Sequence, residues 1–524
     1  NNGRFVHLAN LVARAGFVLA RSQLAQSVQT SRDSVDVAKS YGHFASPSQR
    51  GPMTTTIYPA RRIITMNPAI PFAEAVAVRD GRVLAVGTVE ELAGWGEHTV
   101  DNTFADKVLM PGFIEAHTHV MSGGVWQFPY VGFFDRKDPQ GNLWTGCTSV
   151  DAVLDRLAEH ESQLEDASSP LIAWGLDPIY FPDDRLLAEH LDRVSLTRPI
   201  YVYHASAHLA TVNTAMLDFS EINEHSITPG IARNADGTPN GELQEPAAMM
   251  LARSGMTEIA MAIMSNEAKW NYAYEARNAG HTLLTDLGTT RVNDADSLDA
   301  WREVTDDPAY PARIMVAGSP MFGGPQEPAD LSRIVNDLKA QTTDKLKFGI
   351  IKLVLDGSIQ GFTARVSWPH YYDAPEGHPG NGLWLMAPEQ LADIVSDHHA
   401  AGITVHCHCN GDQAAEVFID AVEAALERHP RWDHRHTVQH SQLTTKAQYK
   451  RMAAMGMCAN IFSNHIYYWG DQHRDSTVGP ERAAGMDACA TALREGVSFS
   501  IHSDTPVTPL GHLHVAWCAV NRLT

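Results

Sequence analysis

Two histidines spaced two residues apart, His117 and His119, are the first residues of this sequence that could do metal chemistry. They lie in GFIEAHTHV, an apolar run that is typical of a strand, so both side chains point to one face while Thr118 points to the other. Imidazoles on one face can share a metal ion. Two core histidines would give the same pattern, so further ligands are needed to support a metal site.

Lys352 and Asp504 are candidates for such ligands. Lys352 lies in the apolar run GIIKLVLDG, where a buried ammonium is costly unless it is paired or neutralised. A salt bridge with Asp356 is the structural alternative. Asp504 ends the run FSIHSD before a proline-containing loop, where a helix N-cap or turn aspartate is the alternative.

His408 and His440 are the remaining candidates, and each has a rival. His406 lies on the same strand and the same face as His408. His436 competes with His440 but lies at the entrance of its strand. Either rival fits a packing or hydrogen-bonding role.

The elements that must position these residues form a repeating pattern after residue 111. Apolar runs alternate with helical patterns, which predicts parallel strands in an α/β fold, a (β/α)8 TIM barrel. The eight runs are 112–119, 281–288, 312–318, 350–357, 403–411, 436–442, 458–463 and 499–504. Lys352, His408, His440 and Asp504 then fall on strands 4, 5, 6 and 8, where a barrel metal site draws its ligands.

The domain organisation is read from the remaining segments. Residues 53–110 are rich in short β patterns and predict a small β-sandwich-like domain, and residues 111–524 form the barrel domain. A long insertion after strand 1, about residues 120–280, is expected at the carboxyl ends of the strands. Residues 1–52 are interpreted as a leader or extension outside the fold.

A family resemblance rests on VLMPGFIEAHTHV, IIKLVLDGSIQGFTA, HCHCNGDQA, VQHSQ and SIHSDTPV. Together they resemble family 3 of the amidohydrolase superfamily, the branch of the YtcJ-like proteins and N-substituted formamide deformylase. The resemblance runs from about residue 55 to the end. The HCNGD context favours His408 over His406. The C-terminal segment with which the family completes its small β domain is expected to be missing.

The resemblance implies a metal-dependent hydrolase that cleaves a C–N bond of a non-peptide amide, of the N-acyl or N-formyl amine type. Lys352 would carry carbon dioxide as a carbamate that bridges two divalent cations. Zn(II) is the expected metal, with one or two ions per chain. Metal-activated hydroxide would attack while Asp504 serves as the acid and base. The metal ligands would be His117, His119, Lys352, His408, His440 and Asp504.

Weaker candidates surround this set. His208 could act in catalysis by polarising a carbonyl, and Asn213, Glu245, Asp356 and Gln360 could contact substrate. A structural role for Asn213 and Glu245 is equally compatible with their motifs, HLATVNTAML and GELQEPA.

Two other functions remain open. A mononuclear deaminase of the same superfamily typically carries a glutamate three residues after the strand-5 histidine, where this sequence has Gly411. A catalytically inactive binding protein on the same fold is the second alternative.

Composition limits the partners. The net charge of -21 argues against nucleic acid, and the absence of a long apolar run argues against a membrane span. Six sparse cysteines indicate a reducing compartment, so a cytoplasmic protein is expected. A small-molecule amide is the expected partner, and the sequence leaves a homo-oligomer open.

Overall fold

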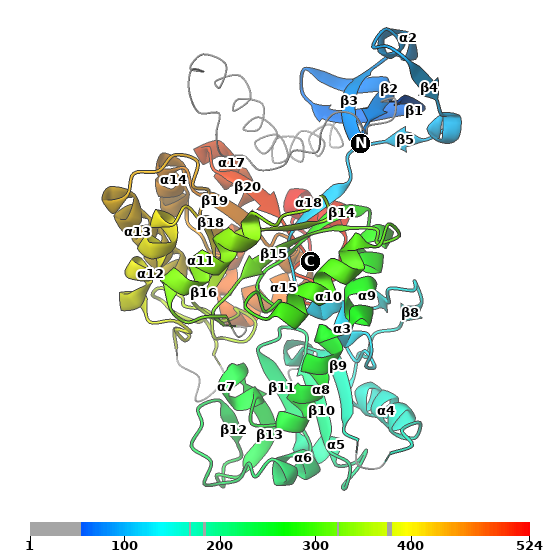
Figure 1. The fold of residues 1–524 in the computed structure, drawn as a ribbon. Coiled ribbons are helices and arrows are strands. Elements are labelled where there is room, and N and C mark those ends of the chain that lie inside the picture. The colour runs from blue at the N-terminus through cyan, green and yellow to red at the C-terminus, as the bar shows by residue number, and fades with distance from the viewer. Residues whose placement is uncertain (1–53, 167–168, 182–184, 322–323, 375–379) are drawn as a thin grey trace. The chain divides into compact units, whose positions relative to one another are not determined.

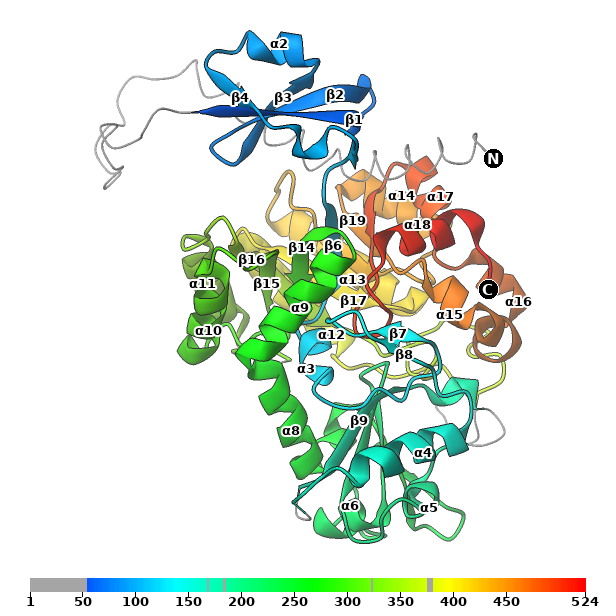
Figure 2. The same ribbon diagram turned by 90° about the vertical axis from the view of Figure 1, so that its right-hand side faces the viewer.

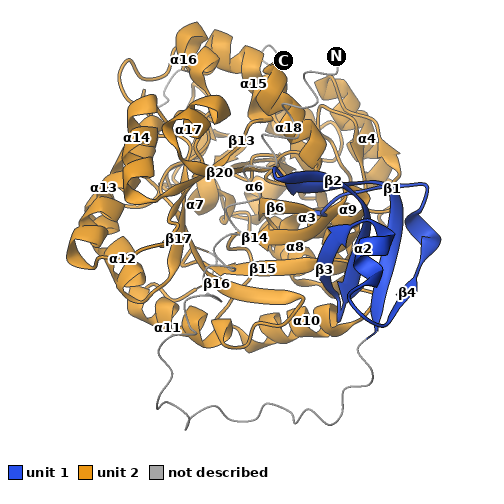
Figure 3. Cartoon of the chain, turned by 90° about the horizontal axis from the view of Figure 1, so that it is seen from above, with its two compact units in different colours: residues 1–112 blue, residues 113–524 orange. Residues whose placement is uncertain are grey.

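The computed structural model describes residues 54–166, 169–181, 185–321, 324–374 and 380–524. The predicted leader, residues 1–52, lies outside the described residues. The chain divides into two compact units, residues 1–112 and 113–524 (Figure 3). In the described part, no helix has both the length and the apolar character that crossing a bilayer requires.

The first unit contains one five-stranded sheet with the order β3-β2-β1-β4, and β5 also pairs with β1. Asp80 and Gly81 both have positive φ, which suits the tight turn between β2 and β3. Small and aliphatic side chains such as Ile57 and Leu92 form its core. The sandwich-like arrangement stays a prediction. The elements are β1 (Thr55–Asn67), β2 (Ile70–Arg79), β3 (Arg82–Gly87), α2 (Val89–Ala93), β4 (His98–Val100) and β5 (Val108–Leu109).

The second unit is built on an eight-stranded parallel sheet, and each of the eight predicted runs supplies one of its strands. The order β20-β19-β18-β17-β16-β15-β14-β6 follows the chain from its last strand back to its first. The strands are β6 (Phe113–Thr118), β14 (His281–Asp286), β15 (Arg313–Gly318), β16 (Leu346–Val354), β17 (Thr404–Cys409), β18 (Thr437–His440), β19 (Cys458–Ile461) and β20 (Ser498–Ile501).

Hydrogen bonds near the strand ends bring β20 back to β6, so the sheet is a nearly closed TIM-like barrel. The His119 amide donates to the Thr505 carbonyl at 3.1 Å, and the Ser503 amide donates to Glu115 at 3.0 Å. Helices surround the strands when the barrel is viewed from above (Figure 3). They are α9 (Asn266–Asn278), α10 (Ala295–Asp306), α11 (Pro328–Lys339), α12 (Pro388–Ala400), α13 (Asp412–Arg428), α14 (Lys446–Met455), α15 (His465–Gln472), α16 (Gly479–Gly485), α17 (Cys489–Glu495) and α18 (His512–Asn521).

Between β6 and β14 the chain forms a second sheet with the order β12-β13-β11-β10-β9. Figures 1 and 2 show this sheet beyond the carboxyl ends of the barrel strands. The Trp469 indole donates to Asp177 at 2.8 Å and so ties this region to the barrel. Its main elements are α3 (Met121–Val125), α4 (Val150–Glu161), β9 (Leu171–Leu176), α5 (Ala188–Leu191), β10 (Ile200–His204), β11 (Leu209–Val212), α6 (Thr214–Phe219), β12 (Ile231–Arg233), β13 (Pro239–Gln244), α7 (Glu245–Met249) and α8 (Arg253–Met264).

Candidate metal centre

The six predicted ligands come from the carboxyl-terminal parts of five barrel strands or from the residues just after them. His117 lies near the end of β6 and His119 follows that strand, while Asp504 lies three residues beyond β20. Lys352 and His408 lie within β16 and β17, and His440 is the last residue of β18. The parallel register carries these side chains toward one end of the barrel.

Asp504 is the carboxylate at the centre of this group. Its Oδ1 lies 3.4 Å from His117 Nε2 and 3.3 Å from His119 Nε2, and its Oδ2 lies 3.6 Å from His440 Nδ1. Atoms that bind one tetrahedral ion at about 2.0–2.2 Å lie roughly 3.3 Å from each other. His117, His119 and Asp504 therefore have the mutual spacing of ligands to a single ion.

Lys352 and His408 adjoin the same group. Lys352 Nζ lies 3.3 Å from His117 Nε2, and the rings of His408 and His440 have centroids 4.4 Å apart. The His117 and His440 rings are 4.5 Å apart. The structure thus brings all six predicted ligands into one connected cluster.

A buried amide relay behind this cluster sets which ring nitrogens carry protons. The Gln439 carbonyl oxygen accepts from Asn460 Nδ2 at 2.8 Å, so it is also the acceptor for His117 Nδ1 at 2.7 Å. The Asn460 oxygen accepts from His502 Nδ1 at 3.1 Å, which leaves His502 Nε2 to accept from His440 Nδ1 at 3.2 Å. His117 and His440 therefore both keep an unprotonated Nε2, the form that binds a metal.

Gln439, Asn460 and His502 were not among the residues predicted from the sequence. His502 lies beside His117 and His440, and ligand atoms of these three residues lie within 4.8 Å of one another. The only sequence signal was position, since His502 is two residues before Asp504 and Gln439 directly precedes His440.

Electrostatics favour neutral imidazoles and an ionised carboxylate. Burial lowers the pKa of His117, His408 and His440 well below the usual value. Burial alone would raise the pKa of Asp504, but the hydrogen bond and charge of His119, together with the charges of His502 and Lys352, hold the pKa below the usual value. Burial also lowers the pKa of Lys352 to about 8, against the opposing charge of Asp504.

These residues fit a divalent cation. His440 Nε2 and Asp504 Oδ1 are buried and have no hydrogen-bond partner among the described residues. Neutral imidazole and carboxylate are the donors that Zn(II) and similar ions accept in proteins. A cation would compensate the buried charge of Asp504 and complete the coordination of both atoms.

Asp356 lies after β16, next to His408, and Gln360 follows on the same loop. Asp356 Oδ1 is 3.7 Å from His408 Nε2, and backbone amides of Asn410 and Gly411 donate to its carboxylate at 3.0 and 2.9 Å. Burial raises the pKa of Asp356 to about 7 although these hydrogen bonds lower it. The Gln360 side-chain oxygen is buried and has no partner in the described part of the chain.

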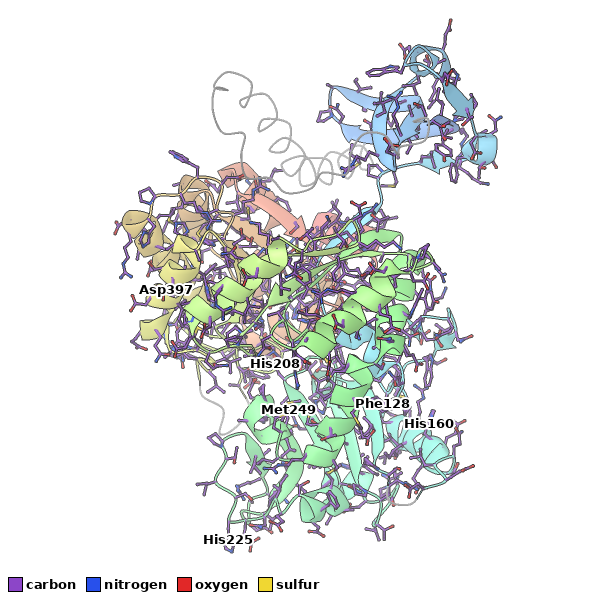
Figure 4. All side chains as sticks on the ribbon, in the orientation of Figure 1. Phe128, His160, His208, His225, Met249 and Asp397 are labelled. Carbon is purple, nitrogen blue, oxygen red and sulfur yellow. The ribbon has the colours of Figure 1, made fainter. Side chains whose placement is uncertain are left out.

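His208 and Glu245 form a pair contributed by the region between β6 and β14. His208 Nδ1 lies 2.8 Å from Glu245 Oε2, and the ring centroid of His208 is 6.0 Å from that of His408. Figure 4 shows His208 where this region meets the barrel. Burial lowers the pKa of His208, but the Glu245 carboxylate, with smaller contributions from Asp504 and Asp356, makes the net shift upward.

Asn213 does not join the cluster. Its side-chain oxygen accepts from the amides of Ile200 and Met216, and its amide group donates to the carbonyls of Ser195 and Arg198. It caps the N-terminus of α6, so its hydrogen-bonding groups are used within the second sheet. This is the structural alternative that the sequence left open.

The two rival histidines have structural contacts. His406 Nδ1 accepts from the Gln439 amide group at 2.6 Å and so belongs to the relay. His436 Nε2 lies 2.8 Å from His399 Nδ1, and the Val405 amide donates to its Nδ1 at 3.0 Å. Neither is a member of the cluster around Asp504.

A barrel with imidazoles, a lysine and an aspartate gathered at the carboxyl ends of its strands defines a metal-dependent hydrolase. The comparisons with known proteins agree with this class. The model of the amidohydrolase family matches residues 105–524, so the chain belongs to that family. It is a hydrolase of the metal-dependent amidohydrolase superfamily, in the YtcJ-like branch.

Curated relatives cover most of the chain at low identity. Protein LONG AFTER FAR-RED 3 of Arabidopsis thaliana is 26% identical, with 88% of this chain and 77% of the relative covered. Putative amidohydrolase YtcJ of Bacillus subtilis is 26% identical, with 86% and 80% covered. N-substituted formamide deformylase of Arthrobacter pascens is 25% identical, with 86% and 81% covered.

A solved structure supports the fold. An uncharacterized metal-dependent hydrolase from Pyrococcus horikoshii matches with a TM-score of 0.62 and 17% identity, covering 89% of this chain and 86% of that one.

Proposed function

We propose that this protein hydrolyses the C–N bond of a non-peptide amide, of the N-acyl or N-formyl amine type. The observation that carries the proposal is the position of Asp504, whose two carboxylate oxygens face His117, His119 and His440 at 3.3–3.6 Å. One carboxylate placed among metal-binding imidazoles can bind a cation and also exchange protons with a reacting group.

The six clustered residues would hold one or two divalent cations, with Zn(II) the best match to the donors. A bound cation would polarise the substrate carbonyl and acidify a water molecule. Lys352 would supply a further ligand. Burial lowers its pKa to about 8 and so favours the neutral amine, which is the form that adds carbon dioxide. The resulting carbamate would be an anionic ligand with two oxygens.

Asp504 would transfer the protons. Its depressed pKa keeps it ionised, so it can accept the proton of the attacking water. It then donates this proton to the nitrogen of the breaking C–N bond. An amine leaves poorly until it is protonated, so the same carboxylate serves both halves of the reaction.

His208 would contact substrate from the opposite wall. Because Nδ1 is paired with Glu245, Nε2 is the nitrogen free to donate a hydrogen bond to the substrate carbonyl. Asp356 and Gln360 are further substrate-binding candidates, because they lie on the loop beside His408.

Deamination is the weaker candidate because of the packing at Gly411. A Cβ at this position would lie 1.8 Å from the Arg365 carbonyl oxygen, so the glutamate that deaminases typically carry there does not fit this backbone. Gly411 instead brings its amide to Asp356 at 2.9 Å.

The experiment is a screen of N-formyl and N-acyl amines with metal-replete full-length protein, alongside metal analysis. We expect amine release by the wild type and at least about a thousandfold less by Asp504→Asn, which removes the acid and base. Stoichiometric metal without turnover of any amide would favour the inactive binding protein instead. Release of ammonia from amino-substituted rings would favour the deaminase.

A further inference from the structure

A second cluster of histidine and carboxylate lies on the same strand as the metal centre. Glu115 is on β6, His281 begins β14 and His512 begins α18. One ligand atom from each lies within 4.8 Å of the other two, and His281 Nε2 is 3.4 Å from Glu115 Oε2. This last distance equals that between His117 and Asp504 in the first centre.

We propose that Glu115, His281 and His512 form a second binding site for a divalent transition-metal ion. The site is separate from the centre at Asp504, because Glu115 precedes His117 by two residues. Two residues along a strand span about 6.6 Å, too far for one ion to bind both clusters.

Unpartnered nitrogens support a ligand at this place. His281 is buried, and apart from the Glu115 carboxylate 3.4 Å from its Nε2, neither of its ring nitrogens has a partner in the part of the chain that the structure describes. His512 Nδ1 is buried and lacks one as well. A buried imidazole normally forms a hydrogen bond through at least one nitrogen. Unpartnered buried nitrogens on two rings beside one carboxylate therefore indicate a cation that would bind their lone pairs.

The charge balance points the same way. Glu115 has no exposed surface, and its hydrogen bonds come from the amide and hydroxyl of Ser503 at 3.0 and 3.2 Å. Both of these donors are neutral, and the His281 ring 3.4 Å from Glu115 compensates the charge of the carboxylate only when it is protonated. A cation bound by two imidazoles would compensate it. A simple Glu115–His281 ion pair would use one nitrogen and leave His512 unexplained.

The donor set defines the class of ion. Two imidazoles and one carboxylate suit Zn(II), Fe(II) or Co(II), whereas Mg(II) and Ca(II) prefer oxygen ligands. His512 is partly exposed, which gives the ion a route to the site. Phe113 stacks on His512 with ring centroids 5.1 Å apart and covers the cluster.

The position of the site suggests what the ion would do. Glu115 binds Ser503, and Ser503 directly precedes Asp504, so an ion on Glu115 would hold the loop that carries the proposed acid and base. The ion would also join β6, β14 and α18 near the seam where β20 meets β6. We therefore assign it a structural role.

The test uses the full chain stripped of metal with a chelator, in a His117→Asn/His119→Asn/His440→Asn background that disables the first centre. Co(II) is added and followed by equilibrium dialysis and by its visible absorption. We expect about one Co(II) per chain in this background. His281→Asn or His512→Asn should weaken that binding at least about tenfold, as loss of a ligand does.

His514→Asn is the matched control, because His514 lies on the same helix and contacts Cys518. It should leave Co(II) binding unchanged. A background chain that binds no Co(II), or that binds it equally well after both His281→Asn and His512→Asn, overturns the proposal. Each variant is melted first, and the background stoichiometry decides the outcome if the His281→Asn chain does not fold.

Discussion

Two clusters share strand β6, one around Asp504 and one around Glu115. Both combine imidazoles with a buried carboxylate at 3.3–3.4 Å. The first lies at the carboxyl ends of the strands and receives residues from β6, β16, β17, β18 and the loop after β20. The second joins β6 and β14 to α18. The first cluster therefore lies where substrates bind in such barrels, whereas the second lies between elements that hold the barrel together.

The difference also lies in what supports the imidazoles. Gln439 and Asn460 fix the protonated nitrogens of His117 and His440 in the first cluster. In the second, no residue outside the cluster partners the nitrogens of His281 in the described part of the chain. A catalytic metal site needs further residues that orient its ligands through hydrogen bonds. We expect the first cluster to control turnover and the second to control stability.

The largest expected effect distinguishes the role of Asp504 from that of Glu115. Asp504→Asn should lower kcat/KM for an N-formyl amine at least about a thousandfold, because it removes the proposed acid and base. Glu115→Gln should lower it about tenfold or less while reducing the melting temperature, because Glu115 does not touch substrate. Equal losses of activity in two folded variants would contradict the division between the clusters.

Lys269 and Lys352, both buried, provide the next comparison. Lys352→Ala should lower kcat/KM about a hundredfold, and added short carboxylic acids should restore part of it by supplying a carboxylate. Lys269 also has a pKa near 8 because of burial, but it donates to the Met264 carbonyl at 2.8 Å. Lys269→Ala should cost stability and show no rescue by acids. Rescue of both variants, or of neither, would argue against a carbamate on Lys352.

A smaller effect is expected in the amide relay. Gln439→Leu should weaken Zn(II) binding about 10- to 100-fold, because His117 loses the acceptor that fixes its tautomer. Gln413→Leu is the control, since Gln413 bonds Arg365. Competition with a chromogenic chelator measures both affinities. Unchanged Zn(II) affinity in a folded Gln439→Leu chain would show that the relay does not support metal binding.

The smallest effect concerns His208. Glu245 raises the pKa of His208, so Glu245→Gln should lower it, and His208 should lose its proton at a lower pH. If protonated His208 binds the substrate carbonyl, the basic limb of the kcat/KM profile moves toward lower pH in Glu245→Gln. A basic limb that stays in place would exclude His208 from this step.

The parallel strands could be predicted from the sequence because their apolar runs are local. The ligands His117 and His119 were visible for the same reason, since alternation on one strand places both on one face. Lys352 was visible because an ammonium is unusual within an apolar strand.

Residues whose roles depend on distant partners could not be predicted. Glu115, His281 and His512 are separated by up to 397 positions. Glu115 and His281 lie in predicted strand runs, but no spacing within either run indicates that these residues meet His512. For Asn213 the sequence left a substrate contact and a structural role open, and the structure shows that its side chain caps α6. Which of two faces a lone polar residue occupies is decided by tertiary packing.

The most direct test of the metal centre is anomalous diffraction from the zinc-loaded protein. We expect a zinc peak within about 2.0–2.2 Å of His117 and Asp504. A fully loaded, folded chain in which zinc binds elsewhere and leaves Asp504 uncoordinated would contradict the proposed centre.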